Sequence, residues 1–134
     1  MFDEKLMKTG TALAAHCNAG TESEALDTLY AEDCVSVEAL AMPEGPEEGK
    51  MGREANGLDA IRAKHEWWYA NNEEHSSNTD GPYFYGDDTF YLIFDMDITD
   101  KTSGDRMQMR EVGRYQIDGE GKVCREEFSY PPMG

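Results

Sequence analysis

One predicted strand, Arg106 to Ile117, carries a charged residue in the middle of its apolar side. Glu111 lies at the centre of that side. A carboxylate that points toward a core costs free energy unless a partner or a ligand is there. We therefore expect Glu111 to lie in a pocket rather than in a solid core. The apolar residues of this side alternate along the strand and are Met107, Met109, Gly113, Tyr115 and Ile117.

The preceding strand, predicted at Thr89 to Thr99, has the same alternation and leads into a hairpin turn at Asp100 to Asp105. Pairing the two ends of this turn fixes which residues face each other. The inner side then forms a hydrophobic floor around the carboxylate, and the outer side is charged but complementary. Such an outer side fits either a solvated surface or a polar dimer interface. The predicted pairs are Phe90 with Tyr115, Phe94 with Glu111, Met96 with Met109, Tyr91 with Arg114 and Asp95 with Arg110.

The rest of the chain predicts helices first and strands last. Apolar residues at helical spacing run from Phe2 to His16, and Gly20 ends the pattern. Thr21 to Glu24 matches a capping box that begins a short second helix. A longer helix is expected later in the chain, between the first strand and the remaining ones. Its predicted range is Leu58 to Asn72, and the further strands are Cys34 to Ala41, Ser77 to Gly86 and Lys122 to Tyr130.

Two details of this arrangement stay open in the sequence. The register of the last strand decides whether Arg125 and Glu127, or Glu126 and Phe128, face the pocket. The segment Ala41 to Gly57 is rich in Pro, Gly and charge. It lies between two candidate pocket elements, so it is either a lid over the pocket or an ordinary solvated loop.

Length and charge exclude several classes of protein. A chain of 134 residues is the size of one domain, so we expect a single domain over residues 1–134. Lys and Arg number 12 and Asp and Glu 28, which gives a formal net charge of −16. This charge repels nucleic acid and anionic membrane surfaces, so neither is expected as a partner.

The cysteines favour a reducing compartment. Cys17, Cys34 and Cys124 are odd in number, lack CxxC spacing and each lie in an apolar pattern. They indicate reduced core residues rather than a disulfide or zinc framework. No apolar run near the N-terminus is long enough for a signal peptide or a membrane span. The expected location is the cytoplasm.

The long predicted helix supplies a second candidate residue. Leu58, Ile61, His65 and Trp68 fall on one stripe, so His65 faces the same side as the core residues. Beside a carboxylate it would act as a general base or a proton donor, or it is a hydrogen-bonded core histidine. Trp67 lies on the opposite side of the helix, and which side faces the cavity stays open. His16, on the inner stripe of the first helix, is a weaker pocket candidate.

Several segments together resemble one known family. The order of elements, from two helices through a strand, a loop and a long helix to several strands, is similar to the nuclear transport factor 2-like superfamily, and to SnoaL-like domains in particular. This resemblance implies an α+β fold shaped like a cone, with N-terminal helices packed on a curved, mostly antiparallel sheet around a pocket. It also implies a homodimer. The matching segments are Leu29 to Val35, Gly57 to Ile61, Gly121 to Val123 and Arg125 to Phe128.

The same resemblance suggests a catalytic acid on the first strand. Val37-Glu38-Ala39 stands where the ketosteroid isomerase members have their acidic base motif, with Glu in place of the usual Asp. The added methylene changes the reach of the carboxylate, so Glu38 is either a base or a surface group paired with an Arg. Steroid isomerisation is not expected, because His16 rather than a Tyr lies on the inner stripe of the first helix.

Two functions follow as alternatives. The first is an acid/base enzyme of the isomerase, cyclase or dehydratase type that acts on a small, largely apolar substrate. In this enzyme Glu38 is the base, His65 is the acid or orienting group, and Glu111 tunes their pKa values. The second is a non-catalytic ligand-binding or dimerisation module, in which Glu111 belongs to a structural network. Neither a cofactor nor a metal is predicted, since HxH and HxxxH spacings are absent. The side chains expected to shape the pocket are His16, Trp68, Phe94, Met109 and Tyr115.

Overall fold

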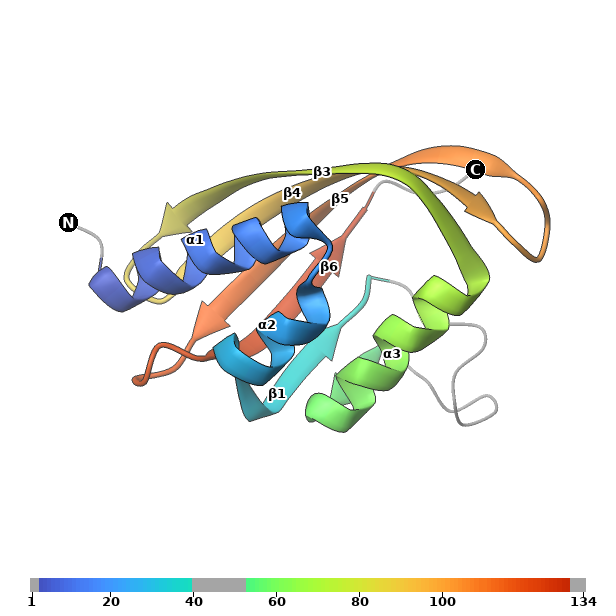
Figure 1. The fold of residues 1–134 in the computed structure, drawn as a ribbon. Coiled ribbons are helices and arrows are strands. Elements are labelled where there is room, and N and C mark those ends of the chain that lie inside the picture. Colours follow the sequence, from blue (N-terminus) through green and yellow to red (C-terminus); the bar gives the residue numbers. More distant parts are fainter. Residues whose placement is uncertain (1–2, 40–52, 131–134) are drawn as a thin grey trace.

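The structure, a computed structural model, describes residues 3–39 and 53–130 of the chain. Helices dominate the first half and long strands the second (Figure 1). In chain order the elements are α1 (Glu4–Ala19), α2 (Glu22–Leu29), β1 (Tyr30–Val37), β2 (Glu54–Asn56), α3 (Leu58–Asn71), β3 (Asn72–Tyr85), β4 (Thr89–Asp100), β5 (Arg106–Ile117) and β6 (Val123–Ser129).

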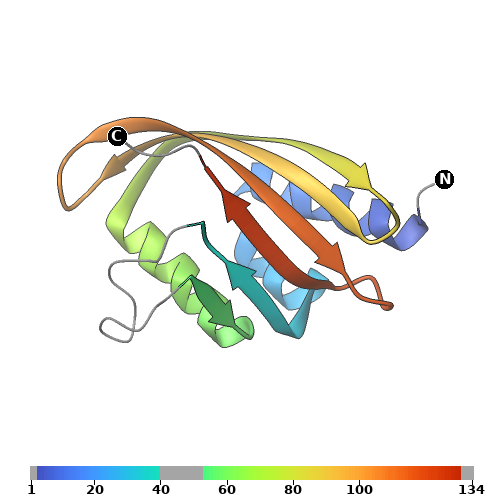
Figure 2. The same cartoon turned by 180° about the vertical axis from the view of Figure 1, so that it is seen from behind.

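The strands form one bent sheet in the order β2-β1-β6-β5-β4-β3. Every neighbouring pair is antiparallel except β1 and β6, which run parallel. All three helices lie on the concave side, as Figure 1 shows, and the view from behind in Figure 2 shows the opposite side of the sheet without helices. The predicted α+β arrangement of helices on a curved, mostly antiparallel sheet is confirmed.

Helix α1 ends before Gly20 as the sequence predicts, and it begins at Glu4, two residues after the start of the predicted pattern. The side chain of Asp3 accepts hydrogen bonds from the backbone N–H groups of Lys5 (2.8 Å) and Leu6 (3.3 Å), which caps the first turn. At the other end Gly20 adopts a φ of 72°, the left-handed conformation that glycine tolerates best. The apolar stripe between these ends, including Leu13, is buried against the sheet.

The capping box predicted for α2 is wrong in its side-chain detail. The helix does begin after Thr21, but the Thr21 side chain makes no capping hydrogen bond. Its hydroxyl lies 2.7 Å from Nδ1 of His16 instead. The end of α1 therefore competes for the hydroxyl that a capping box would use.

The main differences from the predicted strands are two earlier starts and one additional strand. Strand β1 begins four residues before Cys34, and β3 begins at Asn72, directly after α3, instead of at Ser77. The first residues of β3 are polar and exposed, so they lack the apolar alternation that marks a strand in a sequence. Within the predicted loop Ala41 to Gly57, Glu54–Asn56 forms β2 and pairs with β1. Residues 40–52 of the candidate lid lie outside the described residues.

The hairpin register of β4 and β5 is confirmed at every predicted pair, including Phe94 opposite Glu111 and Asp95 opposite Arg110. The open question about β6 is also settled. Glu126 lies opposite Tyr115 and Phe128 opposite Gly113, which gives the inner face to the pair Glu126 and Phe128.

Only one end of the concave face is filled by a solid core. The rings of Phe90 and Tyr115 stack there with centroids 5.0 Å apart. Gly113 allows this arrangement, because a Cβ at its position would lie 2.7 Å from the Tyr115 ring. Cys17 and Cys34 are free and buried, and Cys124 is free and half-buried. Large fully buried side chains include Leu6, Leu13, Leu26, Ile61, Phe90, Leu92, Ile98 and Val123.

Candidate functional site

The other end of the concave face encloses a cavity with a volume of about 360 Å³. Along β4 the change is abrupt, because Phe90 and Leu92 are fully buried while Phe94 and Met96 line the cavity. Helix α3 forms the opposite wall. The structure brings all three candidate catalytic residues into this cavity, together with most of the predicted pocket residues: Glu38, His65, Glu111, Trp68, Phe94, Met109 and Tyr115.

His16 is the exception among the predicted pocket residues. Within the described part of the chain it does not line this cavity, and its Nδ1 lies 2.7 Å from the hydroxyl of Thr21. The expectation that His16 shapes the pocket is therefore wrong. Near the end of α1 the ring is used to connect α1 to the start of α2, while Leu13 and Cys17 face the cavity.

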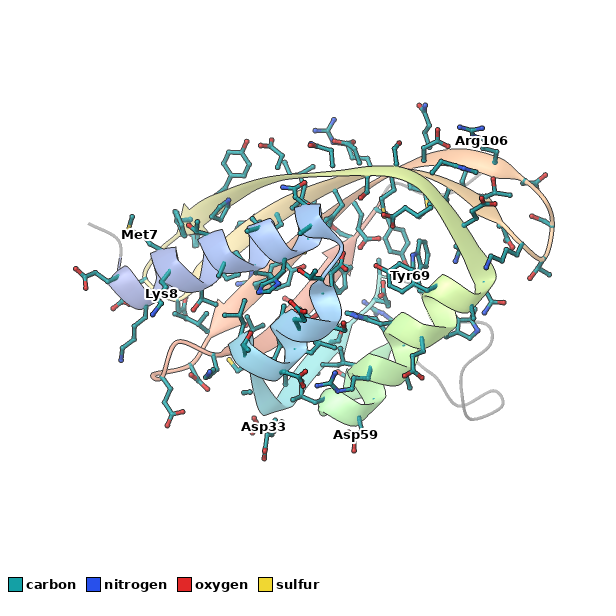
Figure 3. The ribbon with its side chains drawn as sticks, viewed as in Figure 1. Met7, Lys8, Asp33, Asp59, Tyr69 and Arg106 are labelled. Atoms are coloured by element: carbon teal, nitrogen blue, oxygen red, sulfur yellow. The ribbon has the colours of Figure 1, made fainter. Side chains whose placement is uncertain are left out.

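Helix α3 presents a wider surface to the cavity than either predicted side alone. Trp67 and Trp68 both line it, and so does Tyr69, which Figure 3 labels at the C-terminal part of the helix. Asn71 and Asn72 donate hydrogen bonds from their side-chain amides to the carbonyls of Trp67 and Trp68. These bonds satisfy backbone acceptors at the helix end, where β3 follows without a loop.

A buried lysine on α3 is the main feature that the sequence prediction missed. Lys64 Nζ lies 2.7 Å from Oε1 of Glu38 and donates a 2.6 Å hydrogen bond to the Ser36 hydroxyl. It also lies 4.8 Å from the centre of the Phe128 ring. The Lys64 and Glu38 side chains are only 9% and 13% exposed, so this ion pair is shielded from water. Three residues after Ile61, Lys64 falls on the core stripe, and that spacing is the signal that could have found it.

Ser36 connects this ion pair to a second buried carboxyl. Its hydroxyl lies 3.2 Å from Oε2 of Glu126, whose residue is 1% exposed. Burial raises the pKa of Glu126, and Lys64 with the hydroxyls of Tyr30 and Ser36 opposes that rise. The other oxygen, Oε1, has no hydrogen-bond partner among the described residues.

Glu111 has the opposite environment from Glu38. Burial first, and then the negative charge of Glu38, raises the pKa of Glu111 to about 8, while Lys64 opposes this rise. The Glu111 carboxyl therefore holds a proton at neutral pH in this environment. Glu38 keeps a cation at 2.7 Å, and Glu111 makes no ion pair with any described residue.

Comparisons with known proteins agree with this geometry. The sequence profile of the SnoaL-like domain matches residues 13–130. A crystal structure of a candidate SnoaL-like polyketide cyclase from Mesorhizobium loti is 34% identical, covers 92% of this chain and 97% of its own chain, and superimposes with a TM-score of 0.80. This chain belongs to the SnoaL-like domain family. No curated protein sequence matches it significantly.

More distant structures share only the fold of this SnoaL-like domain. The Delta 5-3-ketosteroid isomerase of a Mycobacterium species is 16% identical over 95% of this chain and 93% of its own, with a TM-score of 0.67. RV0760c of Mycobacterium tuberculosis, solved in complex with estradiol-17beta-hemisuccinate, is 15% identical over 96% and 95%, with a TM-score of 0.69. Both support the nuclear transport factor 2-like cone that the element order predicts.

His65 does not fit the role of proton donor in this SnoaL-like domain. Burial and the neighbouring charge of Lys64 lower the pKa of His65 to about 4. The imidazole is therefore neutral at neutral pH, and it can accept or donate a hydrogen bond but cannot act as an imidazolium acid. The sequence stripe predicts the position of His65, whereas its protonation depends first on burial and then on the charge of Lys64, and both are known only from the fold.

The described part of the chain also bears on metal binding and on membrane insertion. No group of three or more His, Cys, Asp or Glu side chains there has a geometry that would hold a metal ion. The helices in the same ranges include none that is long and apolar enough to cross a membrane.

Proposed function

We propose that the cavity binds a small, largely apolar molecule and that Glu38 moves protons on it as a general base, in an isomerisation, cyclisation or dehydration. One observation carries this proposal: two carboxyl groups, Glu38 and Glu111, line the same cavity in opposite electrostatic environments. Pairs of acids whose environments separate their pKa values are typical of proton-transfer sites.

Glu38 is assigned as the base because it is the carboxyl group of the ion pair with Lys64. The ammonium lies 2.7 Å from Oε1, and both side chains line the cavity. A base of this kind takes a proton from the ligand and returns it to another atom of the same ligand. The reacting C–H group must come within hydrogen-bond distance of the carboxylate, which the cavity-lining position of Glu38 allows.

The other two candidates act on the base and on the ligand. Glu111 tunes Glu38, because ionisation of Glu111 would add a second negative charge to the same cavity. His65, neutral at neutral pH, orients a polar group of the ligand through a hydrogen bond. The fold shared with a ketosteroid isomerase and with a protein bound to a steroid ester is consistent with an apolar ligand.

The test is hydrogen exchange on a carbon acid. We expect the protein to catalyse the conversion of 3-cyclohexen-1-one to 2-cyclohexen-1-one, followed by ultraviolet absorbance, and to exchange the α-protons of cyclohexanone in D₂O, followed by NMR. Glu38→Gln should lose both activities, whereas Glu24→Gln, which removes an exposed carboxylate on α2, should keep them. If wild type and Glu38→Gln give the same rates, the proton-transfer proposal fails. The cavity then belongs to a non-catalytic ligand-binding or dimerisation module.

We also propose a homodimer formed through the helix-free face of the sheet. The support is the ladder of opposite charges on that face, such as Asp95 and Arg110, and the implied assembly of the family. Light scattering checks this proposal, and the mass of one 15.1 kDa chain at working concentration would overturn it. The single domain and the cytoplasmic location stay predictions.

A further inference from the structure

The cavity is lined by more acidic than basic side chains. Among the described residues that line it, Lys64 is the one cationic side chain, and it already contacts Glu38. His65 lines the cavity as a neutral ring. The carboxyl groups of the lining are Glu22, Glu38, Glu74, Glu111 and Glu126.

Glu126 gives a second, independent observation. Its Oε1 is buried, lines the inner face and has no hydrogen-bond partner among the described residues, although the residue is 1% exposed. Buried polar atoms in folded proteins are nearly always paired, since an unpaired one costs free energy. A positive charge placed in the cavity would compensate this carboxyl through the low-dielectric interior even without touching it.

Aromatic rings surround the same region. Phe128 packs edge-on against Tyr115, with centroids 6.1 Å apart, and lies 6.5 Å from Phe94, which pairs with Glu111 across the sheet. The faces of such rings attract cations. Lys64, 4.8 Å from the Phe128 centroid, shows that this interaction already operates inside the cavity.

We propose that the ligand of this cavity is an organic cation, an ammonium compound with apolar substituents, held beside the carboxyl groups of Glu111 and Glu126 and by the rings of Phe94, Tyr115 and Phe128. The proposal rests on the binding half of the proposed function and names the ligand class, while Glu38 remains the base. The formal net charge of −16 would also draw cations toward the protein.

Binding of such a cation should reduce the number of protons bound to the protein. The charged and titratable groups that face Glu111 are Glu38 after β1, Lys64 and His65 on α3, and Glu126 on β6. Their sum keeps a proton on Glu111. A ligand cation beside Glu111 favours the carboxylate, so binding at neutral pH releases a proton and Glu111 becomes the counter-ion of the ligand.

The experiment compares three molecules that have one shape and three charges. Phenyltrimethylammonium, tert-butylbenzene and benzenesulfonate each carry a tetrahedral group on a phenyl ring. We expect the cation to bind at least about tenfold more tightly than its neutral isostere, which is about 1.4 kcal/mol, and the anion not to bind. Isothermal titration in two buffers with different ionisation heats should also detect proton release with the cation alone.

Matched variants assign the effect to the cavity. Glu111→Gln should reduce the affinity for phenyltrimethylammonium and abolish proton release, whereas Glu24→Gln removes the same charge from the exposed surface of α2 and should do neither. Urea unfolding of each variant verifies that it is folded. Equal binding of cation and isostere, no binding of the cation, or equal losses in both variants would overturn the proposal. Tight binding of tert-butylbenzene would also overturn the organic-cation proposal, and it would indicate a cavity for neutral apolar ligands. The α-proton exchange assay tests the role of Glu38 separately.

Discussion

The two faces of the same sheet treat carboxyl groups in opposite ways. On the inner face, burial raises the pKa values of Glu111 and Glu126. On the outer face, hydrogen bonds from Arg106 and Arg114 lower the pKa values of Asp97 and Glu127. Glu126 and Glu127 are neighbours in the chain, so the alternation of a strand is enough to reverse the behaviour of one residue type.

This difference indicates where stability and function are located. Figure 3 shows Arg106 on the side of the sheet away from the helices, where its guanidinium makes two hydrogen bonds of 3.0 and 2.9 Å to Asp97. Acids there have partners and water. The inner acids have fewer partners, and acids with pKa values shifted in this way are candidates for a functional site.

The largest expected effect on the free energy of unfolding comes from removing Lys64 on the inner face, and removing Arg106 on the outer face is the comparison. Lys64→Met leaves Glu38 without its partner in a shielded site, and breaking a pair of this kind costs about 3 to 5 kcal/mol in the free energy of unfolding. Arg106→Met breaks a pair in which the Arg side chain is 63% exposed, and the expected cost is much smaller because water screens the pair. Urea unfolding at neutral pH measures both.

Similar losses in the two variants would remove the electrostatic distinction between the faces. Lys64→Arg is the matched control, because it retains the charge and the chance of contacting Glu38. We expect it to recover part of the stability that Lys64→Met loses. No recovery would mean that packing of the lysine stem, rather than its charge, is what the site needs.

A second prediction uses pH to compare one acid from each face. Because the folded state holds the pKa of Glu111 at about 8 against an ordinary 4.5, it binds more protons than the unfolded state between these values. Stability therefore falls as pH rises from about 4.5 to 8, by roughly a few kcal/mol. Glu111→Gln does not titrate, so its stability advantage over wild type should grow across that range and then level off.

Asp97→Asn should show the reverse sign. The pKa of Asp97 is lowered from 3.8 by Arg106, so its contribution is present above that pH and is lost as the pH falls below it. Unfolding curves recorded from pH 3 to 9 give both profiles. A flat difference between Glu111→Gln and wild type would show that Glu111 is ionised and solvated, which would contradict its place in the cavity.

The sequence predicted the hairpin and missed the electrostatics, for a physical reason. Period-2 alternation and one turn determine which residues face each other, so Phe94 opposite Glu111 and Asp95 opposite Arg110 needed no distant information. Lys64, the partner of Glu38, lies 26 residues away on α3, and Glu126, the partner of Ser36, lies on a strand near the C-terminus. Only the folded chain brings them together.

Residue-type expectations also misled the prediction. Lys64 has the spacing of a core residue but the chemistry of a surface residue, so the stripe was assigned to His65. The sequence does not predict which face Glu126 takes, because a shift of one residue in register decides it. It does not predict the start of β3, because the residues there are polar on both sides. Where pattern and chemistry disagreed, the pattern was the better guide.

The smallest expected effect is on the outer face, where a charge swap tests whether that face is solvated. Asp95 and Arg110 lie 3.6 Å apart and their side chains are 48% and 65% exposed. Exchanging them, as Asp95→Arg with Arg110→Asp, retains the cross-strand attraction, so the monomer should change by no more than about 0.5 kcal/mol. Urea unfolding and light scattering should be read together. A small change in stability with an unchanged mass is the result expected for a solvated pair. A loss of dimer mass would show that Asp95 and Arg110 contact a second chain. The swap preserves the pair between these two residues, so it can disturb only contacts with a partner chain.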